Sequence, residues 1–173
     1  NEMPNKASVA AAAVFIFMNK TGFRGLCRYG PNGFNVPFGN YINPGILDED
    51  NLRALHSLFQ RVVFTCCPFE EALERVKGVV YLDPPYDTRE KYGFVGYTVK
   101  GFDKPTQERL FTWVENNHRH CFIALSNNAI PALVDRFTTR GLKVNTFTAK
   151  RAINSKNPAA TTSEVIISSG DRQ

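Results

Sequence analysis

The chain has 173 residues, 43% of them hydrophobic, which is enough for one domain with a substantial core. Its net charge of +5 and isoelectric point near 9.1 suit a polyanionic partner. The longest apolar run, residues 9–18, is too short to cross a bilayer and no signal peptide is present, so we expect an intracellular protein and neither a membrane protein nor a secreted one. The four cysteines lack metal-type C-x-x-C spacing, so we expect reduced thiols and no bound metal.

Basic residues gather in two segments that contain no acidic residue, 3–47 and 142–163. The middle third of the chain is close to neutral. The two basic segments could form two walls of one groove for a polyanion, or they could be ordinary solvated surfaces; their charge is compatible with both.

The first third predicts a helix, a hairpin and a second helix. Residues 6–19 are Ala-rich and apolar around most of the helix circumference, so we expect a buried helix. The next stretch is rich in glycine and aromatic residues, and its central Gly-Pro-Asn-Gly, residues 30–33, predicts a hairpin turn. Aromatic rings beside arginines in such a loop are typical of surfaces that stack on bases and contact phosphates. Asp48 or Asp50 can cap a helix to about residue 60, whose leucines share one face and predict a core contact.

Residues 61–66 predict a strand and residues 70–77 a short exposed helix, followed by the stretch V-V-Y-L-D-P-P-Y-D at 79–87. Residues 79–82 predict a buried strand, which the two prolines end because each lacks a backbone donor and fixes its own φ. Ligands of open α/β sheets bind at the carboxyl ends of strands. There the Asp83 carboxylate and the Pro84 carbonyl could accept hydrogen bonds from an exocyclic amino group, while the ring of Tyr86 stacks on a heterocycle. The alternative is a proline-capped strand end whose aspartate only caps the next turn.

The remaining sequence completes an α/β pattern. A long loop at 87–102 has the length and composition of a lid or binding loop. Helices are predicted at 106–116 and 130–140, and strands at 121–125, 142–149 and 164–168. The polar, basic loop at 150–163 joins the last two strands.

Asp-Pro-Pro-Tyr after an apolar strand resembles the catalytic motif of amino-methyltransferases, which act on adenine N6, cytosine N4 or a glutamine amide. The resemblance implies a partial Rossmann-like sheet that uses S-adenosylmethionine as methyl donor. It implies a catalytic corner made of Asp83, Pro84, Pro85 and Tyr86. It also implies cofactor contacts from Asp83, Tyr86 and Phe69, although Pro68 stands where an acidic or small polar residue is common and Phe69 could equally be core.

The stretch N-K-T-G-F-R-G-L-C-R-Y-G followed by G-F-N-V-P-F-G-N-Y closely resembles the target-recognition region of the DNA adenine methyltransferase (Dam) family. Residues 1–60 would then be an inserted recognition region whose hairpin enters the major groove, and residues 61–173 the catalytic α/β part. The DNA contacts implied by matching positions are Phe23, Arg24, Leu26, Arg28, Pro37, Asn40, Tyr41, Tyr97, Arg151 and Asn154. Arg24 stands where Asn is common and Asn40 where Arg is common, so GATC is the expected target by family default, with CATG-like sites open. Ser126 and Asn127 also match the family's strand-then-Ser-Asn pattern.

The family's glycine-rich F-x-G-x-G loop does not occur in these residues. We therefore expect a truncated or processed chain, corresponding to the family's C-terminal two-thirds, that depends on a missing N-terminal segment or a complementing chain. The sequence predicts a DNA adenine methyltransferase of the cytoplasm, the nucleoid or a viral factory, serving restriction-modification, repair or epigenetic marking. The alternatives are a catalytically silent, sequence-specific DNA-binding remnant and a methyltransferase of another amino group, such as cytosine N4 or RNA adenine.

Overall fold

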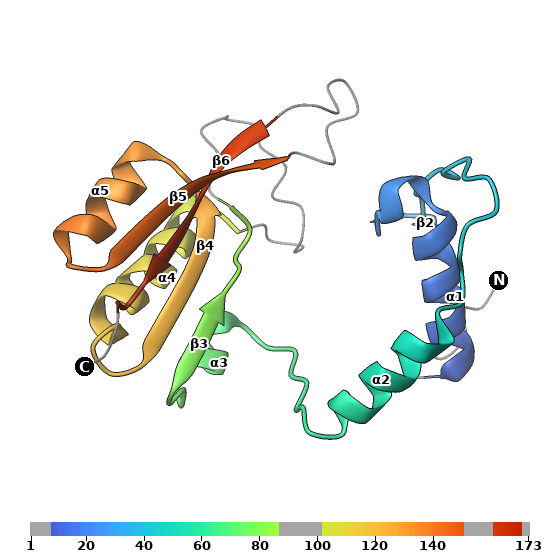
Figure 1. The fold of residues 1–173 in the computed structure, drawn as a ribbon, viewed down its shortest axis with the longest axis horizontal. Helices are drawn as coiled ribbons and strands as arrows, with labels where there is room; N and C mark the ends of the chain where they lie inside the picture. The colour runs from blue at the N-terminus through green and yellow to red at the C-terminus, as the bar shows by residue number, and fades with distance from the viewer. Residues whose placement is uncertain (1–7, 87–101, 151–160, 171–173) are drawn as a thin grey trace. The chain divides into compact units, whose positions relative to one another are not determined.

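The computed structural model describes residues 8–86, 102–150 and 161–170 (Figure 1). The chain divides into two compact units, residues 1–64 and 65–173, which are described separately. No helix in the described ranges is long and apolar enough to span a membrane. Three of the predicted DNA contacts, Tyr97, Arg151 and Asn154, lie outside the described residues.

The first unit contains helix α1 (Val9–Thr21), a short 3-10 turn η1 (Phe23–Gly25), hairpin strands β1 (Tyr29–Gly30) and β2 (Gly33–Phe34), and helix α2 (Glu49–Phe59). The two strands pair antiparallel, with Tyr29 opposite Phe34, which confirms the hairpin predicted from Gly-Pro-Asn-Gly. Helix α2 begins where predicted, because the side chain of Asp48 accepts a hydrogen bond from the backbone N–H of Asn51 at 3.2 Å.

Three expectations for this half of the chain were wrong. Within α1 only Thr21 is buried, whereas Phe15 and Phe17 are 47% and 52% exposed; α2 has no buried residue. Residues 62–66 form no strand, and Val63 is 88% exposed. An apolar pattern shows which face of an element can be buried, but burial also needs a packing neighbour, and a strand needs a hydrogen-bonded one.

The second unit is a mixed α/β layer structure, in agreement with the predicted α/β class. Its sheet has the strand order β3-β4-β6-β5, formed by β3 (Val79–Leu82), β4 (Phe122–Asn128), β6 (Thr161–Ser168) and β5 (Lys143–Lys150). Strands β3 and β4 are parallel, and the other two pairs are antiparallel. The helices are α3 (Phe69–Leu73), α4 (Lys104–Asn117) and α5 (Pro131–Thr139) (Figure 1).

One hydrophobic cluster joins the helices of this unit to the sheet. Leu110 and Val114 of α4 and Phe137 of α5 are almost completely buried, together with Ile123 of β4 and Ile167 of β6. Strand β3 is an edge strand of this sheet, and within it Val80 is buried, whereas Val79 and Tyr81 are 76% and 64% exposed. The prediction of a buried strand was therefore wrong for one face, because successive side chains point to opposite faces of the sheet and only the face that carries Val80 is covered.

The parallel pairing of β3 and β4 fixes what meets at their carboxyl ends. Leu82, the last residue of β3, lies opposite Leu125 of β4. The residues that follow in the two strand directions are Asp83 after Leu82 and Ser126 after Leu125. They therefore lie side by side at the same edge of the sheet, where α/β proteins bind their ligands.

Candidate active site

The corner that follows β3 consists of Asp83, Pro84, Pro85 and Tyr86, and it has no regular secondary structure. Asp83 is exposed, whereas the two prolines and Tyr86 are half-buried. The corner thus presents a carboxylate to solvent from a backbone that is partly packed. The role of Asp83 as an acceptor for a substrate amino group stays a prediction.

Strand β4 supplies the first anchor of the corner. The hydroxyl of Ser126, a buried residue, donates a hydrogen bond to Oδ1 of Asp83 at 2.7 Å. The same hydroxyl lies 3.3 Å from the hydroxyl of Tyr81 and 3.3 Å from the carbonyl oxygen of Leu82. The carboxylate is therefore held by a neighbouring strand as well as by its own backbone.

Helix α4 supplies the second anchor. Nε2 of Gln107, which is 4% exposed, donates a hydrogen bond to the carbonyl oxygen of Pro85 at 2.7 Å. The first turn of α4 is fixed by Asp103, whose carboxylate accepts from the backbone N–H of Thr106 at 3.0 Å and from its hydroxyl at 2.6 Å. Sequence reasoning missed this contact with the corner, because no local pattern encodes a bond between residues 22 positions apart.

The Tyr86 hydroxyl is neutral at physiological pH. Burial raises the pKa of Tyr86 above its usual value, and the nearby charges of Asp83 and Glu164 and the neighbouring Tyr81 raise it further, against a smaller lowering by a hydrogen bond with Ser126. Tyr86 therefore offers a flat, uncharged ring and a hydroxyl that keeps its proton. This state suits stacking on a base and does not suit proton abstraction.

Phe69, the predicted cofactor contact, is the first residue of α3. Its ring is half-buried and packs against the core, with its centroid 6.0 Å from that of Phe102 and the two planes inclined at 58°. Pro68 before it makes no side-chain capping bond. Phe69 thus contributes to the core and still exposes part of its ring.

The first unit brings several predicted DNA contacts together. The backbone N–H of Phe23 donates to the carbonyl of Pro37 at 2.8 Å, and that of Arg24 donates to the hydroxyl of Tyr41 at 2.8 Å. The Arg24 guanidinium lies 5.3 Å from the centre of the Phe23 ring. Phe23, Arg24, Pro37 and Tyr41 therefore form one contiguous group, and the backbone N–H of Leu26 donates to the carbonyl of Phe23 at 3.2 Å.

Arg24 and Asn40 both adopt a left-handed backbone, with φ of 54° at each. This conformation costs a residue other than glycine about 1 kcal/mol or more, and Asn tolerates it better than Arg does. The two positions at which the sequence departs from the Dam-like pattern are thus also positions of backbone strain. Tyr41 packs over Gly39, where a β-carbon would collide with the tyrosine ring, so its position depends on that glycine.

Arg28 stabilises the hairpin through two hydrogen bonds to Asn35. Its Nε donates to Oδ1 of Asn35 at 2.7 Å and its Nη2 donates to the backbone carbonyl of Asn35 at 2.9 Å. Both residues are exposed. Because a guanidinium has five N–H groups, Arg28 can hold the hairpin and still present donors to a phosphate.

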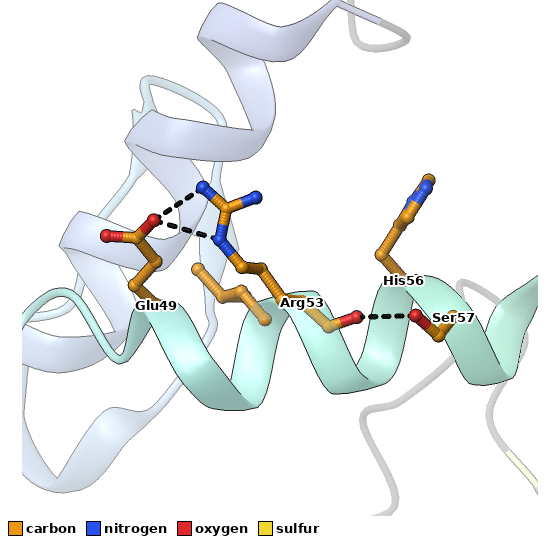
Figure 2. A pocket seen from close by; sticks show the side chains of 5 residues that line it. Glu49, Arg53, His56 and Ser57 are labelled. Carbon is orange, nitrogen blue, oxygen red and sulfur yellow. Dashed lines mark hydrogen bonds and ion pairs between the residues drawn. The ribbon is translucent and has the colours of Figure 1, made fainter.

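Figure 2 shows a surface hollow on α2, lined by Glu49, Leu52, Arg53, His56 and Ser57. Glu49 and Arg53 form an exposed ion pair in it, and the hydroxyl of Ser57 donates to the carbonyl of Arg53 at 3.1 Å. None of the predicted catalytic, cofactor or DNA contacts lines this hollow. Its ion pair and helix hydrogen bond account for the side chains there, and we assign it no chemistry.

Comparison with known proteins decides the family. A model of the D12 class N6 adenine-specific DNA methyltransferases matches residues 1–153. The chain belongs to this family. The resemblance drawn from the catalytic corner and the hairpin is thereby confirmed.

Curated relatives of this D12 family member are named as DNA adenine methylases or as a type II methyltransferase. The chain is 36% identical over 165 residues to the retron Ec67 DNA adenine methylase of Escherichia coli, covering 93% of this chain and 56% of the relative. It is 39% identical over 155 residues to the type II methyltransferase M.MjaIII of Methanocaldococcus jannaschii, covering 86% and 53%. It is 34% identical over 144 residues to a DNA adenine methylase of Vibrio cholerae, covering 81% and 52%. The chain spans about half the length of these relatives.

Proposed function

We propose that this protein is a site-specific DNA methyltransferase that transfers a methyl group from S-adenosylmethionine to N6 of an adenine flipped out of duplex DNA. The observation that carries the proposal is the corner after β3, where an exposed Asp83 carboxylate is anchored by Ser126 in a chain of the D12 family. In this interpretation residues 61–173 are the catalytic part of a Rossmann-like sheet, and residues 1–60 are the inserted recognition region. The parallel pair β3-β4 and the separate compactness of the first unit support this division.

The chemistry follows from the acceptors at the corner. An adenine amino group is a weak nucleophile because its lone pair is delocalised into the ring. The Asp83 carboxylate would accept one N6–H bond and the Pro84 carbonyl the other, which favours a nitrogen rehybridised toward sp3 with its lone pair available. Fixed acceptors of this kind stabilise the transition state more than the ground state. The neutral ring of Tyr86 would stack on the base and set its distance from the methyl donor.

S-adenosylmethionine, when bound, would supply an electrophilic methyl group on a sulfonium, and the C–S bond that breaks would leave the neutral thioether S-adenosylhomocysteine. The N6 lone pair would form the new C–N bond, and one N6 proton would be released to solvent past the exposed Asp83 carboxylate. The described residues fit it at two points: Phe69 exposes part of an aromatic face for its adenine, and Asp83 presents an exposed carboxylate beside Tyr86. No group of three or more His, Cys, Asp or Glu side chains in the described ranges could hold a metal ion. Because F-x-G-x-G does not occur in these residues, we propose that a segment outside them or a complementing chain completes the donor site.

The first unit would hold the DNA. Phe23, Pro37 and Tyr41 would approach the bases, while Arg24 and Arg28 would contact phosphates or a guanine edge. We propose a GATC-like target, with CATG-like sites as the nearest alternative, and action on DNA in the cytoplasm, nucleoid or a viral factory. Flipping the base costs a few kcal/mol, which the aromatic surroundings and the stacking ring of Tyr86 would offset.

Methyl transfer to defined duplexes tests the proposal. The chain is assayed alone and joined to the N-terminal part of a curated relative, with radiolabelled S-adenosylmethionine and duplexes that contain GATC, CATG or neither. We expect label in N6-methyladenine of one duplex, with the joined form more active. Label in cytosine N4 would refute the adenine assignment. Specific duplex binding without transfer by either form would indicate a catalytically silent remnant.

Arg28→Ala is expected to weaken duplex binding and to reduce the slope of log affinity against log salt by about one, because one phosphate contact is lost. Fluorescence anisotropy at several salt concentrations measures both quantities. Asn35→Ala is the matched control, since it removes the Oδ1 partner of Arg28 and leaves the positive charge in place. An equal change in salt slope for both variants would show that Arg28 acts through the hairpin and not on a phosphate.

A further inference from the structure

Ser126 connects more of the catalytic corner than any prediction from sequence indicated. It belongs to β4, is 4% exposed, and lies beside Asp83 because β4 pairs parallel with β3. Its hydroxyl oxygen is 2.7 Å from Oδ1 of Asp83, 3.3 Å from the Tyr81 hydroxyl and 3.3 Å from the Leu82 carbonyl.

The hydrogen-bonding capacity of a hydroxyl limits how these contacts are arranged. A serine hydroxyl has one proton to donate and two lone pairs that accept. The proton goes to Asp83, because that contact is the shorter one and its acceptor is charged, so the Leu82 carbonyl is at most a weaker alternative. One lone pair then receives the proton of the Tyr81 hydroxyl. This donated bond polarises the bond from Ser126 to Asp83 and strengthens it.

We propose that Ser126 is a positioning residue for methyl transfer, whose hydroxyl holds the Asp83 carboxylate in the arrangement that receives the target base. Ser126 occupies Oδ1 of Asp83 and thereby leaves Oδ2 to the amino group. An exposed carboxylate without this bond would sample several rotamers, and a misplaced acceptor costs rate even when the base still binds. The inference rests on the proposed function and adds to it a residue that does not touch the base.

Ser126→Ala in the methyl-transferring form of the protein tests this. We expect kcat to fall about 10- to 100-fold, the loss typical of one hydrogen bond to a charged group. KM for the duplex is expected to stay within about twofold, because the base contacts are not removed. Ser126→Thr keeps the hydroxyl and is expected to recover most of kcat. Ser126→Cys keeps a side chain of similar volume but has only a weak hydrogen-bond donor. It replaces Ser126→Ala in the assay if the alanine variant does not fold. Its kcat is expected to lie between those of Ser126→Ala and Ser126→Thr.

The outcomes separate this inference from the proposed function. If the parent transfers methyl, Asp83→Ala does not, and Ser126→Ala keeps the parental kcat, the positioning role is overturned and the function stands. A rise in KM without a fall in kcat also overturns it. If no form of the protein transfers methyl to any duplex, the proposed function fails and the positioning role fails with it.

Discussion

Asp83→Ala is expected to lower the rate of methyl transfer by about 100- to 1,000-fold or more, because it removes the charged acceptor for the N6 hydrogen. The side chain is exposed and follows the end of β3, so its removal leaves the buried cluster of the second unit untouched. The dissociation constant for the duplex is expected to change little. Single-turnover methyl transfer and fluorescence anisotropy measure the two quantities separately.

Two further variants show whether the charge of Asp83 is what counts. Asp83→Asn keeps an oxygen that can accept from Ser126 but loses the negative charge, so we expect an equally large loss of rate. Asp135→Ala removes another exposed aspartate, in α5, and is expected to leave the rate unchanged. An Asp83→Ala variant that retains most of the parental rate would show that the corner has been assigned wrongly.

The parts of the site that could be predicted from the sequence are those encoded locally. The prolines after β3, the Gly-Pro-Asn-Gly turn and the Asp48 cap each act within a few residues, and each lies where the sequence indicated. The anchors of the corner act at long range: Ser126 lies 43 residues from Asp83, and Gln107 lies 22 residues from Pro85. The strand order and helix packing bring them together, and no local pattern of residue types reports either.

Burial was predicted less well than secondary structure, for a related reason. The apolar residues of α1, of α2 and of the segment 62–64 indicated core, yet most of them are exposed. In the second unit the same kind of pattern in α4 and α5 does mark the core, because both helices meet the sheet. An apolar face can be buried, but only the fold decides whether another element packs against it.

Arg136→Ala is expected to lower the free energy of unfolding of the second unit by about 3 kcal/mol, because it leaves a buried carboxylate without its main partner. Arg136 of α5 donates to both oxygens of Glu115 in α4, at 2.7 and 3.3 Å, and Glu115 has a side chain that is only 8% exposed. The guanidinium also bonds Glu108 at 2.7 Å and lies over the ring of Phe111 at 5.4 Å. Arg109→Ala is the matched control in the same unit: it breaks an ion pair with Glu70 in which the two side chains are 57% and 47% exposed, and it should cost less than about 1 kcal/mol.

Acidification should remove the difference in the free energy of unfolding between the parent and Arg136→Ala. The hydrogen bond from Arg136 is the main cause that holds the pKa of Glu115 below its usual value of 4.5. A carboxylate with a depressed folded-state pKa contributes stability that is fully present above the unfolded-state value and is lost as the pH falls through the folded-state value. In the variant the unpaired carboxylate is penalised by burial until it is protonated. Urea unfolding at neutral pH and at several values below 4.5 should therefore show the gap between the two proteins closing on acidification. A gap that stays constant would mean that Arg136 stabilises the unit through its stacking on Phe111 and not through its charge. An equal cost for Arg109→Ala would mean that the burial of Glu115 adds nothing to the ion pair.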